Sequence, residues 1–120
     1  MHKQVLIVDD SSMMRKLITR TLTSIDCDIV GEASNGAEAL ELYKDLKPDL
    51  VTMDITMRGM DGFTAAEGIM AFDDQAKILF LSNLDEDKYR EKVVDVGGVG
   101  MAKKHHAEEI EMLKRAVGQD

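Results

Sequence analysis

The sequence predicts an α/β protein with a doubly wound, five-stranded parallel sheet and helices on both faces. Three short apolar runs each stop at a polar group: residues 5–8 at Asp9-Asp10, residues 50–53 at Asp54, and residues 78–81 at Ser82. Such a run is typical of a strand buried on both faces of a parallel sheet. Strand-like and helix-like patterns alternate along all 120 residues, and this alternation favours repeated βα units in one sheet.

The first three predicted units have clear start and stop signals. After a strand over 3–8, Ser11 or Ser12 caps a helix, whose inward face is predicted at Met14, Leu17, Ile18, Leu22 and Ile25. After a strand over 28–33, the turn 34–36 caps a second helix that ends at Pro48, and its inward residues are Ala39, Leu40, Tyr43 and Leu46. After a strand over 49–53, Asp61-Gly62 leads into a third helix, with Phe63, Ala66, Ile69 and Met70 inward.

The last two units are less regular. A strand over 77–81 precedes a helix over 85–96 that ends in valines, which are mediocre helix formers. A strand over 99–103 is weakened by Gly100, and a helix over 107–117 has acidic residues near its start and basic residues near its end, as the helix dipole favours. Five units with right-handed crossovers predict the flavodoxin-like strand order 2-1-3-4-5.

Composition and charge exclude several classes of protein. A chain of 120 residues suffices for one domain with one core. The net charge of −8 disfavours binding to nucleic acid or to an anionic membrane, because both require a positive surface. Cys27 is the only cysteine, which excludes an intramolecular disulfide and a cysteine metal cluster. No apolar stretch approaches the roughly 18 residues of a membrane span, and no signal peptide is evident, so we expect a cytoplasmic protein.

Three aspartates are expected to converge at one edge of the sheet. The predicted strand order places the first and third strands side by side, so Asp9, Asp10 and Asp54 meet at their carboxyl ends. Two unit charges about 4 Å apart repel by ~4 kcal/mol at an effective dielectric constant near 20. Such a cluster must share protons or hold a cation, and oxygen ligands at an open edge suit Mg²⁺. Taken alone, Asp9-Asp10 is equally well explained as a solvated helix start.

A hydroxyl and a lysine are expected at the same edge. Ser82 ends the fourth strand, where it can donate a hydrogen bond to a phosphoryl oxygen or cap the following helix. Lys103-Lys104 ends the fifth strand. An isolated lysine pair is usually surface charge, but at this edge it would complete a phosphoryl-binding site.

These residues resemble the receiver domains of two-component response regulators over essentially the whole chain. The segment 5–10 is similar to the acidic-pair motif of that family, and the segment 49–57 followed by Asp61-Gly62 is similar to its phosphoacceptor segment. Ser82 matches the Ser/Thr switch position, and Lys104 matches the family lysine by its spacing from Gly97-Gly98. The resemblance implies a single receiver domain over 1–120 without an output domain, similar to stand-alone chemotaxis regulators.

The resemblance implies a phosphoryl-transfer mechanism. A histidine kinase would donate the phosphoryl group to Asp54, with Lys104 and Ser82 contacting it. The Mg²⁺ ion would be held by Asp10, Asp54, the Thr56 carbonyl and, largely through water, Asp9. Phosphorylation would switch the surface from the fourth strand to the fifth helix for a protein target, such as a flagellar motor component or a phosphotransfer protein. Catalysis would be limited to the phosphorylation and dephosphorylation of the chain itself, so it is not expected to be an enzyme.

Three positions depart from the family pattern. Arg58 stands where a proline is usual, Met101 where an aromatic residue is usual, and His105 where a proline follows the lysine. Met101 brings the usual aromatic switch into question. A cis bond before His105 would cost ~3–4 kcal/mol, because it would not precede a proline.

Two other classes of protein are disfavoured by particular residues, and three further interpretations keep the receiver fold. A haloacid-dehalogenase-type phosphatase requires an aspartate two residues after its nucleophile, where this chain has Thr56. A flavodoxin requires a neutral phosphate-binding loop, where this chain has the acidic segment 9–12. A pseudo-receiver that is not regulated by phosphate usually lacks an acidic residue or the lysine. A relay intermediate or a phosphate sink would use the same chemistry as a motor effector.

Overall fold

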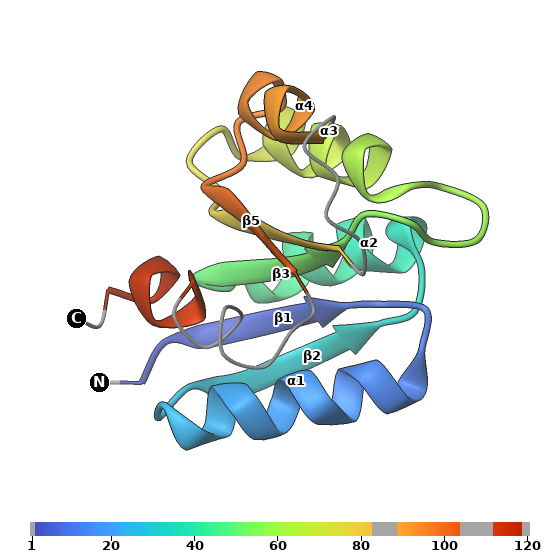
Figure 1. The fold of residues 1–120 in the computed structure, drawn as a ribbon. Helices are drawn as coiled ribbons and strands as arrows, with labels where there is room; N and C mark the ends of the chain where they lie inside the picture. Colours follow the sequence, from blue (N-terminus) through green and yellow to red (C-terminus); the bar gives the residue numbers. More distant parts are fainter. Residues whose placement is uncertain (1, 83–88, 104–111, 119–120) are drawn as a thin grey trace.

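A computed structural model describes residues 2–82, 89–103 and 112–118 and shows one parallel sheet in the order β2-β1-β3-β4-β5 (Figure 1). The strands are β1 (Gln4–Val8), β2 (Asp28–Ala33), β3 (Leu50–Asp54), β4 (Ile78–Ser82) and β5 (Gly100–Lys103). The predicted fold class and strand order are confirmed. Every strand end lies within one residue of its predicted position, and the apolar runs 5–8, 50–53 and 78–81 are buried almost completely.

The first three helices begin where the predicted capping residues stand. The helices are α1 (Ser12–Ser24), α2 (Gly36–Leu46), α3 (Gly62–Phe72) and α4 (Arg90–Asp95), and residues 112–116 are also helical. The side chains of Ser11, Asn35 and Asp61 accept hydrogen bonds from backbone N–H groups three residues later, at 3.2, 2.8 and 2.8 Å. These bonds satisfy N–H groups that have no partner within the helix itself.

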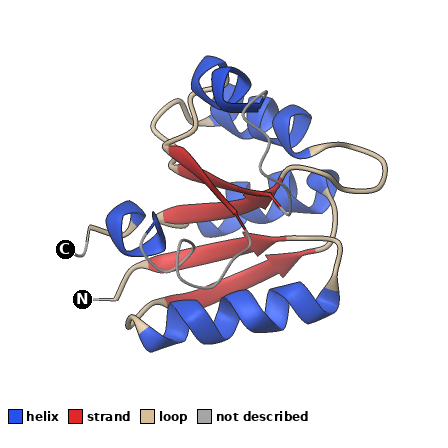
Figure 2. Ribbon diagram, in the orientation of Figure 1, coloured by secondary structure: helices blue, strands red, loops and turns tan. Residues whose placement is uncertain are grey.

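Helices cover both faces of the sheet (Figure 2). On one face, α1 and the segment 112–118 pack against the sheet in one apolar cluster, which includes Ile18, Leu22, Leu113 and Val117. On the other face, α2, α3 and α4 pack in a second cluster, which includes Tyr43, Phe63, Ile69, Phe80 and Val93. Within the described part of the chain, no helix has both the length and the apolar character that a membrane crossing requires.

Parts of the predicted helices differ in the structure. Leu17 was expected on the inward face of α1, but 45% of its surface is exposed. The buried stripe instead runs through Ile18, Thr21 and Leu22, and the Thr21 hydroxyl is accommodated by donating to the Leu17 carbonyl at 3.1 Å. The α4 helix ends one residue before the predicted end at position 96. Residues 83–88 and 104–111, where the rest of α4 and the start of the last helix were predicted, lie outside the described residues.

Candidate functional site

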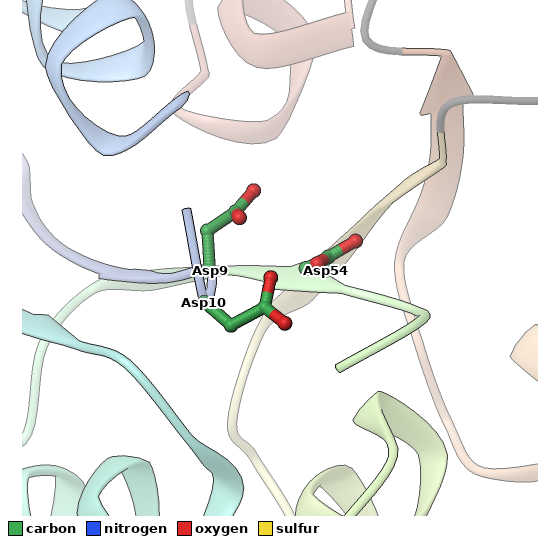
Figure 3. Close-up of side chains that lie close together, drawn as sticks. All are labelled: Asp9, Asp10 and Asp54. Atoms are coloured by element: carbon green, nitrogen blue, oxygen red, sulfur yellow. The ribbon is translucent and has the colours of Figure 1, made fainter. Parts of the chain in front are cut away.

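The carboxyl ends of β1 and β3 bring three aspartates together. Val8 pairs with Met53 across the two strands, so the next residues, Asp9 after β1 and Asp54 at the end of β3, lie side by side. One carboxylate oxygen each from Asp9, Asp10 and Asp54 lies within 4.8 Å of the other two (Figure 3). The convergence expected from the strand order is present in the structure.

Burial makes this cluster costly without a compensating cation. Asp9 is 1% exposed and Asp54 3% exposed, whereas Asp10 lies in an exposed position. Two unit charges 4.8 Å apart repel by about 3.5 kcal/mol at an effective dielectric constant of about 20. Carboxylate oxygens at an edge that is open on one side form a donor set suited to Mg²⁺, which retains several water ligands. The residues present therefore fit a magnesium ion.

The turn between β1 and α1 is fixed at Asp9 by three hydrogen bonds. The Asp9 N–H donates to the Ala33 carbonyl of β2 at 3.0 Å, and Asp9 Oδ1 accepts from the Ser11 N–H at 2.9 Å. The Asp9 carbonyl accepts from Arg15 Nη1 at 2.7 Å. Sequence reasoning did not identify Arg15. Its place one helical turn after Ser11 was the available signal, but basic residues on helix surfaces are common.

The loop between β3 and α3 is folded closely over Asp54. The Gly62 N–H donates to the Ile55 carbonyl at 3.0 Å, and the Arg58 N–H donates to Asp10 Oδ2 at 3.3 Å. A Cβ atom placed on Gly62 would lie only 2.2 Å from the Asp54 carbonyl oxygen. Thr56 lies exposed in this loop. The loop therefore contacts two of the three aspartates through backbone groups, and Gly62 is required for its close approach.

Ser82 and Lys103 lie opposite each other at the same edge of the sheet. They are register partners at the ends of β4 and β5, where Ser82 is buried and Lys103 half-buried. Leu81, which precedes Ser82, is the register partner of Asp54. Lys104, predicted to contact the phosphoryl group, lies outside the described residues, as does His105.

Two cavities lie at opposite edges of the sheet. An open cavity of about 590 Å³ adjoins the aspartates and is lined by Asp10, Ser11, Ser34, Asn35 and Arg58. A cavity of about 220 Å³ lies beside the amino ends of β1, β3 and β4, where the Tyr43 hydroxyl donates to Asp73 Oδ2 at 2.8 Å. Burial raises the pKa of Tyr43 well above its usual range, and this hydrogen bond lowers the pKa of Asp73. The second cavity shares no lining residue with the aspartate cluster.

Known proteins with the same pattern are receiver domains. The family model described as response regulator receiver domain matches residues 5–116. The chemotaxis protein CheY of Thermotoga maritima is 49% identical to this chain over 86 residues, which cover 72% of each chain. The chemotaxis protein CheY of Bacillus subtilis is 48% identical over 86 residues, which again cover 72% of each chain. This chain also resembles a chain in the crystal structure of the CheX-CheY-BeF3-Mg²⁺ complex from Borrelia burgdorferi. The two superpose with a TM-score of 0.86 at 34% identity, over 94% of this chain and 85% of that chain.

Proposed function

This chain belongs to the response regulator receiver domain family of two-component signalling, and from that premise we propose that Asp54 accepts a phosphoryl group from a histidine kinase. One observation supports the assignment to Asp54 above all others. Its carboxylate is buried at the end of the central strand β3, with ligand oxygens of Asp9 and Asp10 within 4.8 Å. Of the three aspartates, Asp54 is the one that lies within a strand. A cation held by Asp9 and Asp10 would draw a phosphoryl group to it.

The transfer exchanges one bond for another. An Asp54 carboxylate oxygen attacks the phosphorus of a phosphohistidine, and the bond between phosphorus and the imidazole nitrogen breaks. The electron pair of that bond remains on the imidazole nitrogen, which takes up a proton when the neutral ring leaves. Because Asp54 ends β3 and the loop that ends at Gly62 packs against its carbonyl, the backbone that carries the carboxylate is fixed before the donor arrives.

Magnesium would be held by Asp10, by Asp54, by the Thr56 carbonyl and, largely through water, by Asp9. When bound, the ion offsets negative charge on the transferring group. The Ser82 hydroxyl is proposed to donate to a phosphoryl oxygen, and Lys104 to pair with the phosphoryl group and with Asp54. Ser82 is suited to this role because it ends β4, the strand next to Asp54.

The proposed output is a change in the surface that runs from β4 to the last helix. Phosphorylation favours one of two arrangements of this surface, because the phosphoryl group interacts differently with each. The relatives named chemotaxis protein, and the neighbour bound to CheX, support a protein target such as a motor component or a phosphotransfer protein. A phosphorelay intermediate or a phosphate sink would use the same chemistry with a different partner.

Intact-mass spectrometry tests the assignment. The protein is incubated with Mg²⁺ and a small-molecule phosphodonor such as acetyl phosphate, and we expect a mass increase of one phosphoryl group. Asp54→Asn should abolish this increase, whereas the matched change Asp74→Asn, in the exposed turn before β4, should leave it unchanged. Absence of labelling in the unmodified chain, or full labelling of the Asp54→Asn variant, would contradict the proposal.

A further inference from the structure

Arg15 connects the aspartate cluster to β2. From the first turns of α1 its Nη1 atom donates to the Asp9 carbonyl at 2.7 Å, and its Nε atom donates to Glu32 Oε1 at 3.1 Å. The Arg15 side chain is 19% exposed, and that of Glu32 is 48% exposed. A charge-assisted bond of 2.7 Å to a backbone carbonyl is at the short, strong end of its class. Arg15 is therefore held between two strands and does not extend into solvent.

The bond to Asp9 constrains the orientation of Asp10. The carbonyl that Arg15 contacts belongs to the peptide group that joins Asp9 to Asp10. Because a peptide group is planar and rigid, fixing its carbonyl oxygen also fixes the nitrogen of Asp10 and limits the directions that the Asp10 side chain can take. The Arg58 N–H also acts on Asp10, through its carboxylate at 3.3 Å, whereas the bond from Arg15 acts on the peptide group from which the Asp10 side chain extends.

We infer that Arg15 is a positioning residue for the proposed magnesium site: it fixes the Asp9–Asp10 peptide so that the Asp10 carboxylate points toward Asp54, and Glu32 in turn holds the Arg15 guanidinium. This inference rests on the proposed function and adds a residue to it. The two bonds leave from different nitrogens of one planar guanidinium. A lysine ammonium is a point charge on a flexible stem, so it cannot donate to the Asp9 carbonyl and to Glu32 in the two fixed directions that the guanidinium provides.

The charge of Arg15 and its geometry have opposite effects on magnesium affinity. As a cation near three carboxylates, Arg15 repels a second cation, so a purely electrostatic role predicts tighter Mg²⁺ binding when its charge is removed. A positioning role predicts weaker binding, because Asp10 would lose its preferred direction. Outer-shell partners of metal ligands typically contribute 10–100-fold to metal affinity. The sign of the change therefore separates the two roles.

Isothermal titration with Mg²⁺ alone measures this sign. The full chain is compared with Arg15→Lys, which keeps the charge, and Arg15→Gln, which removes it. The matched control is Arg20→Gln, an identical change at an exposed position on the same helix. We expect Arg15→Lys, which loses only the geometry, to bind Mg²⁺ about tenfold more weakly. Arg15→Gln should also bind it more weakly, but by a smaller factor, because removing the charge offsets part of the loss. The control should bind as the parent does. Saturating Mg²⁺ should restore phosphorylation of the Arg15→Lys variant.

Thermal unfolding in EDTA is measured on the same variants: a positioning role predicts weaker Mg²⁺ binding with little change in melting temperature, whereas a purely structural role predicts a fall in melting temperature that accompanies the weaker binding. If Arg15→Lys binds Mg²⁺ as the parent does, or Arg15→Gln binds it more tightly, the inference is wrong, whatever happens to the melting temperature. If Arg15→Lys folds poorly, Glu32→Ala takes its place, because it keeps the charge of Arg15 but removes the partner that holds its guanidinium. Glu32→Ala should weaken Mg²⁺ binding more when it is made in the parent than when it is added to the Arg15→Gln variant. If the unmodified chain is phosphorylated on Asp54 and only the Arg15 effect is missing, the proposed function stands and this inference alone is rejected.

Discussion

Replacing Gly62 by alanine tests whether the loop over Asp54 depends on a close backbone approach. The new Cβ would lie 2.2 Å from the Asp54 carbonyl oxygen and 3.1 Å from Ile55 Cα. The first separation is about 1.3 Å short of a comfortable contact near 3.5 Å, and both obstacles are backbone atoms that cannot rotate away. Forced overpacking costs about 1–3 kcal/mol. Gly62 is the first residue of α3, where the higher helix propensity of alanine offsets little of this cost, so from the upper end of that range we expect a net loss of about 2–3 kcal/mol in the free energy of unfolding.

Gly68 provides the matched control within the same helix. A Cβ there would meet the Leu40 side chain, with Cδ2 at 3.4 Å and Cδ1 at 3.8 Å, which is ordinary contact with a flexible side chain. Helix propensity then dominates, and Gly68→Ala should stabilise the protein by up to about 1 kcal/mol. Urea denaturation of both variants measures the difference. The Gly62→Ala variant should also be phosphorylated more slowly, because displacing the Asp54 carbonyl reorients its side chain. Equal stability of the two variants would refute the reasoning.

Two further predictions concern the proposed ligands of the metal and the phosphoryl group. Asp10→Ala should weaken Mg²⁺ binding, measured by calorimetry, more than Asp9→Ala does, because Asp10 is proposed as a direct ligand and Asp9 as one acting largely through water. Equal losses of Mg²⁺ affinity in the two variants would remove that distinction. Lys104→Ala should slow phosphorylation while Lys103→Ala has little effect, and the reverse result in the same mass assay would place the lysine of the site one residue earlier in β5.

The fold and the aspartate cluster were predictable because they depend on local signals. Each of the three apolar runs ends at the last residue of its strand or one residue before it, and Ser11, Asn35 and Asp61 cap helices α1, α2 and α3. Once the strand order follows from five βα units, Asp9 and Asp54 must lie on neighbouring strands. The position of the site is thus a consequence of topology, which few alternatives can satisfy.

The contacts around the cluster were not predictable in the same way. The place of Arg15 one turn after Ser11 is a weak signal that does not separate it securely from Arg20, which stands exposed on the same helix. The difference between the two depends on the position of β2 relative to α1. Leu17 was assigned to the core by its apolar character, but tertiary packing selected Thr21 for the buried stripe. Gly62 was recognised as part of a turn, whereas its contact with the Asp54 carbonyl depends on the folded path of the loop.

The segment around α4 is connected to the Asp54 loop by aromatic contacts. Phe63, in the first turn of α3, lies 5.6 Å from the Tyr89 ring, and the Lys92 ammonium lies 5.0 Å from the centre of the Phe63 ring. The loop and these groups line one cavity of about 290 Å³, which is bordered by Ile55, Thr56, Met57, Asp61, Phe63, Tyr89 and Lys92. Met101, at the position where the family usually has an aromatic residue, is 9% exposed and packs in the same apolar cluster as Phe63.

These contacts predict where phosphorylation changes the protein most. Methionine is unbranched and flexible, so Met101 cannot place a rigid ring in one of two discrete positions. Movement of the loop that contains Thr56 would instead reach α4 through Phe63. Hydrogen exchange with and without beryllofluoride should therefore show the largest change within residues 82–98, and Phe63→Leu should reduce that change while keeping an apolar side chain. Equal protection of this segment in both states, with changes elsewhere, would mean that the signal leaves Asp54 by another route.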